Sequence, residues 1–270
     1  RNMSVDNEKY NSDELVPPQW LNAQFFTEIL DSYLKKQELK ILQVKLAPAS
    51  AKGDHYTSIM FRAEVEYTTQ SNEKSTISLI VKTIPEEQGH KKALLNNSHI
   101  FPTEIAMYTE ILPIFEKVLH EAGDESKLYV PCIYHSLEPR QVMVFEDLVP
   151  QGYAVVRDRP ASKEELRAAL EKLGKWHAVS HKILQEQPEL FEKLQYDVTT
   201  LPNVLQEDFM TTALPVFINM LEKVETLRPF KKYFELMQGK IIDRWVDVIR
   251  EYRENRQPNG FYVVCHGDFH

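Results

Sequence analysis

The last residues of the sequence contain the first candidate for catalysis, Cys265-His-Gly-Asp268. They follow Phe261-Tyr-Val-Val264, a β-branched and aromatic run that predicts a short buried strand. An aspartate just beyond a strand, beside a glycine that lets the backbone bend, is a candidate general base. Glycine and aspartate are also common in ordinary turns, so this segment alone leaves both interpretations open.

A lysine and a glutamate earlier in the chain could form a second reactive group. Lys82 follows Leu79-Ile-Val81 in the most apolar predicted strand, shortly before Pro85. A lysine near a strand end commonly extends to water, but one that points into a cleft needs an anion or a carboxylate as partner. Glu104 lies in the first turns of a predicted helix, where it either complements the helix dipole or orients Lys82.

The periodicity of apolar residues predicts the elements that hold these side chains. Alternation and turn signals predict strands at 41–46, 58–67, 76–84, 129–135 and 141–145, the first three forming an antiparallel meander. Helical spacing predicts helices at 20–36, 99–120, 162–184, 205–224 and 230–253. Ser162 and Glu165 form a predicted capping box at the start of the third of these helices. The chain thus changes from sheet-rich to helical near residues 146–150.

Composition excludes several other classes of protein. With 270 residues, 43% of them hydrophobic, the chain can bury a large core in one domain or two lobes. A net charge of −8 argues against a nucleic-acid partner or an anionic membrane surface. No segment predicts a membrane span or a secretory leader. Cys132 and Cys265 are expected to be two buried thiols, which fits a reducing compartment and predicts a cytoplasmic protein.

Six short motifs in a fixed order carry a resemblance to a known family. They are Gly53-Asp-His-Tyr-Thr-Ser-Ile-Met-Phe-Arg62, Leu79-Ile-Val-Lys-Thr-Ile-Pro85, Glu104-Ile-Ala-Met-Tyr108, Val144-Phe-Glu-Asp-Leu148, Leu173-Gly-Lys-Trp-His-Ala-Val-Ser180 and Cys265-His-Gly-Asp268. Together they resemble the insect ecdysteroid-kinase-like family, which is related to choline kinases and aminoglycoside phosphotransferases.

The resemblance implies an α+β, protein-kinase-like fold with two lobes. A polar N-terminal arm at 1–16 would precede an ATP-binding N-lobe at 17–146, built from an antiparallel five-stranded sheet and one main helix. A mostly helical C-lobe at 147–270 would follow, and the sequence ends within its catalytic loop.

The family's activity implies an enzyme that uses ATP and Mg²⁺. It would be a small-molecule kinase that transfers the γ-phosphoryl group to a hydroxyl of a steroid-like or xenobiotic substrate. The loop containing Gly53, Tyr56, Thr57 and Ser58 would cover the phosphates with its backbone amides. Lys82 would pair with the α- and β-phosphates.

The remaining roles also follow from the resemblance. Glu104 would hold Lys82, and the connector Glu146, Asp147 and Leu148 would offer backbone groups to adenine. Asp268 would accept the proton of the acceptor hydroxyl, and His266 would support the catalytic turn with Cys265 packed behind it.

Two departures from the family pattern bear on this assignment. The phosphate loop has a single glycine, Gly53, and His55 stands where the family often has asparagine. The family's asparagine and acidic magnesium ligands would lie beyond His270, so no metal ligand is expected within residues 1–270. We therefore expect no turnover from these residues alone.

Two other functions compete with the kinase interpretation. The first is a nucleotide- or ligand-binding module without catalysis, a pseudokinase, which the loop departure and the missing metal ligands favour. The second is a metal-dependent hydrolase, because His266, Asp268 and His270 alternate like metal ligands.

Overall fold

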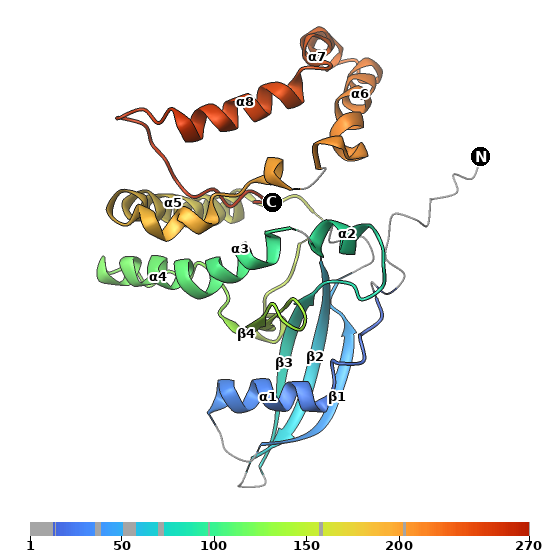
Figure 1. Ribbon diagram of the computed structural model, residues 1–270, viewed down its shortest axis with the longest axis vertical. Coiled ribbons are helices and arrows are strands. Elements are labelled where there is room, and N and C mark those ends of the chain that lie inside the picture. Colours follow the sequence, from blue (N-terminus) through green and yellow to red (C-terminus); the bar gives the residue numbers. More distant parts are fainter. Residues whose placement is uncertain are drawn as a thin grey trace, which may run out of the picture. The chain divides into compact units, whose positions relative to one another are not determined.

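The computed structural model describes residues 13, 15–35, 39–50, 58–69, 73–96, 98–156, 159–201 and 204–269. The chain divides into two compact units, Arg1–Leu194 and Gln195–His270. The first is coloured blue to yellow in Figure 1 and the second orange to red. Each unit is described by itself.

The first unit is built on a five-stranded antiparallel sheet. Its strands are β1 (Lys40–Pro48), β2 (Ile59–Thr68), β3 (Lys74–Thr83), β4 (Cys132–Ser136) and β5 (Val142–Glu146). Their order across the sheet is β1-β2-β3-β5-β4, and every neighbouring pair is antiparallel. The predicted meander of β1, β2 and β3 is therefore confirmed (Figure 1), and β5 pairs with β3.

One face of this sheet packs against helix α1 (Ala23–Leu34). Every second side chain of β2 on this face is buried, as the alternation predicted: Ile59, Phe61, Ala63, Val65 and Tyr67. Phe26, Ile29 and Leu30 meet them from the helix. The helix starts later than the predicted residue 20, because the Asn22 side chain accepts the amides of Gln24 and Phe25.

The opposite face is covered by a helical segment that contains a π turn. It comprises α2 (His90–Asn96), α3 (Ile100–Ala106), the π turn Met107–Ile111 and α4 (Leu112–Glu121). The predicted helix at 99–120 is confirmed, whereas α2 was not predicted. The amide of Leu112 donates to the carbonyl of Met107, and Pro113, which has no amide hydrogen, follows directly. Proline is a common cause of such an interruption.

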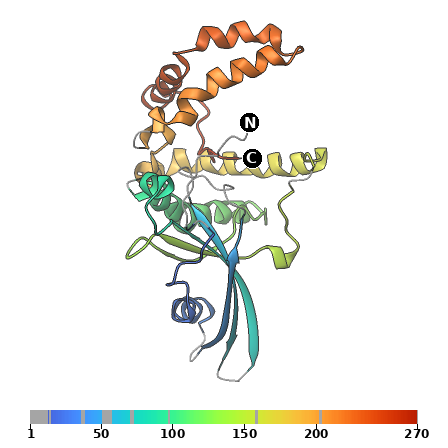
Figure 2. The same cartoon turned by 90° about the vertical axis from the view of Figure 1, so that its right-hand side faces the viewer.

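Helix α5 (Lys163–Glu186) lies beside α4 in both ribbon views (Figures 1 and 2). The rings of Phe115 and Trp176 meet edge to face at 5.4 Å between these helices. Both bonds of the predicted capping box, between Ser162 and Glu165, are present at the start of α5. Short 3₁₀ helices among the described residues are Val149–Gln151, Pro188–Leu194, Val198–Thr200, Val204–Gln206 and Arg228–Phe230.

The second unit contains α6 (Asp208–Lys223), α7 (Lys231–Met237) and α8 (Ile241–Glu254). Phe217 of α6 packs edge to face on Phe234 of α7, with ring centroids 4.8 Å apart. The single helix predicted at 230–253 is instead two helices. Gly239 adopts a left-handed conformation with φ +71° between them, a conformation that glycine accommodates and that ends a helix.

The predicted strand at 261–264 is wrong, because this segment is irregular. Phe261 is 59% exposed, so the segment is not the buried run that its composition predicted. A strand requires a neighbour for its backbone groups; in the described part of the chain the five strands of the first unit pair only with one another. The prediction of two buried thiols is also wrong, since Cys265 is exposed and Cys132 is only partly buried.

Candidate nucleotide-binding site

Lys82 and Glu104 form an ion pair on the sheet face that α3 covers. The Nζ atom of Lys82 donates to Oε1 of Glu104 at 2.6 Å and to Oε2 at 2.7 Å. The side chains are 20% and 23% exposed, so the pair is largely shielded but remains accessible. Strand β3 supplies the lysine and α3 the glutamate, which brings together two side chains that the sequence analysis could only propose as partners.

A tyrosine one helical turn after Glu104 borders this pair. Tyr108 packs its ring edge to face on Phe145 at 5.0 Å and on Tyr129 at 5.9 Å. Burial raises the pKa of Tyr108, and together with the nearby Glu104 and Cys132 it brings the value to about 12. Tyr108 therefore stays a neutral, apolar neighbour of the ion pair. No role was predicted for Tyr108 from the sequence, although its position four residues after Glu104 places both on one helix face.

The connector after β5 is bonded back to the sheet through Asp147. Nε of Arg62 donates to Oδ2 of Asp147 at 2.6 Å, and Nη2 donates to Oδ1 at 3.5 Å. The Ser78 hydroxyl donates to Oδ2 at 2.8 Å, and the Val149 amide donates to Oδ1 at 3.1 Å. The backbone amide of Asp147 in turn donates to the Ser78 carbonyl at 3.1 Å. The carboxylate and the backbone amide of Asp147 are thus engaged within the protein.

The charge of Asp147 is stabilised by these bonds. Its side chain is only 3% exposed, and burial alone would raise its pKa. The donors Arg62, Val149 and Ser78 outweigh burial and hold the pKa below the usual range of an aspartate. A buried carboxylate satisfied in this way fixes the connector in place.

The two neighbours of Asp147 occupy different surroundings. Glu146 ends β5 and accepts a hydrogen bond from the Tyr33 hydroxyl of α1. This bond is the main reason that the pKa of Tyr33 is raised to about 12. Leu148 is partly buried at the start of the 3₁₀ turn.

The predicted phosphate loop lies mostly outside the described residues. Gly53, His55, Tyr56 and Thr57 all fall there. Ser58, the last residue of that loop, is described and buried, at 3% exposure, directly before β2.

The residues predicted for catalysis belong to the second unit. Gly267 is in the left-handed region with φ +83° and makes the turn that the sequence predicted. The backbone amide of Asp268 donates to Nδ1 of His266 at 3.3 Å, and the His266 ring meets Phe269 edge to face. His266 and Asp268 are thereby brought together within this turn, whereas His270 lies outside the described residues.

The described residues contain neither a cluster of metal-ligating side chains nor a membrane-spanning helix. No three histidine, cysteine or acidic side chains among them are placed to hold a metal ion. Within the same ranges, no helix has the length and apolar character needed to cross a membrane. The hydrolase alternative stays a hypothesis.

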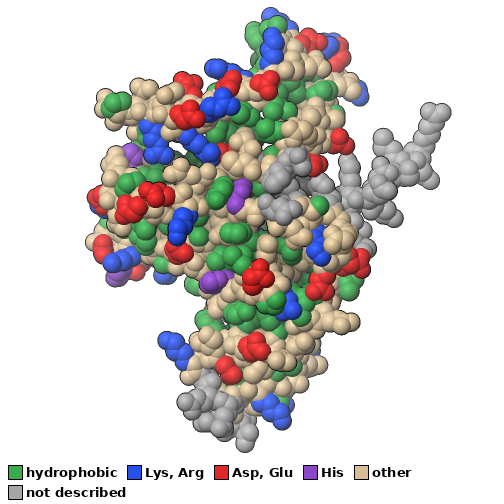
Figure 3. Space-filling view, in the orientation of Figure 1, with side chains coloured by type: hydrophobic (Ala, Val, Ile, Leu, Met, Phe, Trp, Pro, Cys, Tyr) green, Lys and Arg blue, Asp and Glu red, His purple; other side chains and the backbone are tan. Residues whose placement is uncertain are grey.

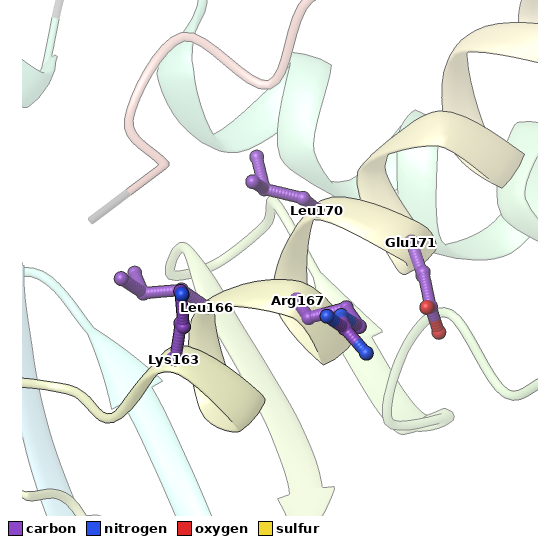
Figure 4. Close-up of a pocket in the computed structure, with 5 residues that line it drawn as sticks. All are labelled: Lys163, Leu166, Arg167, Leu170 and Glu171. Carbon is purple, nitrogen blue, oxygen red and sulfur yellow. The ribbon is translucent and has the colours of Figure 1, made fainter.

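A hollow on α5 is separate from the predicted site residues. It has a volume of about 460 Å³ and is lined by Lys163, Leu166, Arg167, Leu170 and Glu171. Leu166 and Leu170, one turn apart, project from the same side of the helix (Figure 4). The face seen in Figure 3 shows acidic and basic side chains interspersed over the described residues.

A five-stranded antiparallel sheet, a strand lysine held by a helix glutamate and a helical C-terminal part define the class of kinase-like folds. A model of the ecdysteroid kinase-like family matches residues 52–270. The chain therefore belongs to the ecdysteroid kinase-like family, whose members are generally kinase-like phosphotransferases. No curated protein and no solved structure matched the chain.

Proposed function

We propose that the protein is an ATP-dependent kinase that phosphorylates a hydroxyl group of a small molecule. Membership of the ecdysteroid kinase-like family supports the class of reaction. The acceptor class that we propose is a steroid-like or xenobiotic alcohol, which follows from the family and not from any described pocket.

The observation that carries the proposal is the ion pair of Lys82 and Glu104. Phosphoryl transfer depends mainly on positioning and on neutralising phosphate charge. Glu104 contacts the lysine through both carboxylate oxygens, which fixes the ammonium group at a largely shielded but accessible point of the sheet face. A lysine held in this way can bind the α- and β-phosphates of a nucleotide without having to be ordered first.

The other predicted residues take more specific roles in this proposal. Because the amide and carboxylate of Asp147 are engaged within the protein, its neighbours Glu146 and Leu148 would contact adenine. Asp268 would accept the hydroxyl proton, with His266 holding the turn through the Asp268 amide. Gly53, Tyr56, Thr57 and Ser58 would cover the phosphates, and Mg²⁺ would arrive with ATP and neutralise phosphate charge.

Nucleotide binding tests this proposal through a matched pair of lysine variants. Lys45 of β1 also forms a lysine–glutamate pair, with Glu64 at 2.6 Å, but these side chains are 61% and 50% exposed. Wild-type protein should be stabilised by Mg·ATP by about 2.7 kcal/mol at a hundredfold excess over Kd. Lys82→Met should abolish the rise in Tm, and Lys45→Met should retain it.

Removing Lys82 alone leaves Glu104 unpaired, which we expect to cost about 1–3 kcal/mol of stability. The double variant Lys82→Met/Glu104→Gln removes that penalty, so a folded protein remains available for the binding measurement. An equal rise in Tm for wild type and the double variant would contradict the proposed site.

A further inference from the structure

Arg62 is a charged residue on the same sheet face as Lys82. In the antiparallel pair of β2 and β3, Met60 lies opposite Lys82 and Arg62 lies opposite Ile80. Residues directly opposite each other point to one face, and so do residues two apart on a strand. Met60, Arg62, Ile80 and Lys82 therefore share a face, the one opposite to the α1 core.

The position of Arg62 lies between the lysine and the connector. Glu146, the residue before Asp147, is paired with Leu79, three residues from Lys82 along β3. Three strand residues span about 10 Å. A nucleotide whose phosphates reach Lys82 and whose base reaches the connector must therefore cross the part of the face that carries Arg62 and Ile80.

Among the described residues, the guanidinium group of Arg62 is bonded along one edge. Asp147 binds Nε and Nη2, and it is the sole partner of Arg62 among the residues that the structure describes. The Arg62 side chain is 36% exposed, in contrast to the buried Asp147. Asp147 itself is fixed by Ser78 and Val149, so the plane of the guanidinium group is set by the protein.

We infer that Arg62 is a base-binding residue of the nucleotide site and that Asp147 is its positioning residue. A planar cation with one edge fixed presents its flat face to a ring, and arginine stacks well on aromatic systems. The base would lie against the Arg62 guanidinium, beside Ile80 and the connector. Asp147 thus links the connector to β2 and orients the stacking group. The inference rests on the proposed function and assigns the part of the site that binds the base.

Two probes separate base binding from phosphate binding. Binding of Mg·ATP and of inorganic triphosphate is measured by calorimetry on wild type and on Arg62→Met/Asp147→Asn. This double variant removes one positive and one negative charge, so the net charge is unchanged and no buried carboxylate is left unpaired. Its Tm without ligand and its far-UV circular dichroism confirm that it is folded.

We expect ATP affinity to fall about tenfold in the double variant, which lies between an exposed and a fully desolvated cation–π contact. The affinity for inorganic triphosphate should change by less than about twofold, because Lys82 and Glu104 are intact. The single variant Asp147→Asn should lower ATP affinity by a smaller factor and also leave triphosphate binding unchanged. If Arg62 had a merely structural role, its substitution would lower the affinity for both ligands together.

The outcomes also distinguish this inference from the proposed function. If wild type binds both probes and the double variant binds them equally well, the inference is wrong and the proposed site stands. If the double variant is folded but its affinities for ATP and for triphosphate fall by the same factor, Arg62 affects the whole site and the inference is likewise overturned. If wild type binds neither probe, the proposed function itself fails, and the inference fails with it.

Discussion

At the scale of single residues, the surroundings of Glu104 explain how a glutamate on a helix holds the ammonium group of a lysine on a strand. Each carboxylate oxygen of Glu104 accepts a hydrogen bond from Lys82. Tyr108 lies one turn further along the helix, and its pKa is raised to about 12. Ionising Tyr108 would place a phenolate close to Glu104, so the neutral form is required for the observed packing.

Tyr108 predicts a specific dependence of stability on pH. Its folded pKa of about 12 lies above its ordinary value of 10.0, so its contribution is complete below about pH 10 and is lost as the pH rises through 12. Compared with Tyr108→Phe, the wild type should lose about 1.4 kcal/mol of unfolding free energy by pH 11. Urea unfolding of both proteins from about pH 9 to pH 11 measures this difference. A constant difference across the series would contradict the assigned pKa.

The charged network around Asp147 was the main feature that the sequence did not reveal. The connector Glu146 to Leu148 was predicted from its motif, but the sequence alone does not show that Asp147 is buried against Arg62 and Ser78. These three residues come from β2, β3 and the connector, and only the register of the sheet brings them together. Met60 lies opposite Lys82, so Arg62, two residues further along β2, points to the same face as Lys82.

At the scale of elements, strands with one buried face were predicted well from the sequence. The alternation of β2 identified its buried face because each second side chain meets α1 or the core. Composition alone failed at 261–264, where aromatic and β-branched residues stand without a neighbouring strand among the described residues. A strand depends on pairing as well as on composition, and pairing is not visible in a short segment.

We predict that substitution by alanine has opposite effects at two glycines, one between two helices and one within a helix. Gly239 has φ +71° between α7 and α8, where a side chain is strained. Gly174 lies within α5, and an added Cβ there would meet no atom within 4 Å. Gly239→Ala should destabilise the protein by about 1 kcal/mol, and Gly174→Ala should stabilise it by about 0.5–1 kcal/mol.

Thermal or urea unfolding of the two single variants measures these effects. The two changes add the same methyl group, so a shared effect on the unfolded chain is largely removed by comparing them. If Gly239→Ala were as stable as wild type, the left-handed turn between α7 and α8 would be contradicted.

At the scale of the whole molecule, the two compact units carry different parts of the proposed chemistry. The first contains the pair of Lys82 and Glu104 and the connector, which are the residues proposed to bind ATP. The second contains the turn with His266, Gly267 and Asp268, proposed to act on the acceptor hydroxyl. These motifs could be recognised in the sequence because each is a short, local run of residues. The pairing of Lys82 with Glu104 was expected from the family resemblance and is present in the structure.

The most direct test of the central claim follows the transferred group itself. The complete polypeptide is incubated with Mg²⁺, ATP labelled in the γ-phosphoryl group and a panel of hydroxylated steroids and xenobiotic alcohols. We predict a labelled phosphate ester of at least one alcohol, formed about 10²–10⁴-fold more slowly by Asp268→Asn, which cannot accept the hydroxyl proton. Nucleotide binding without any labelled ester, or an ester formed equally fast by Asp268→Asn, would contradict the account.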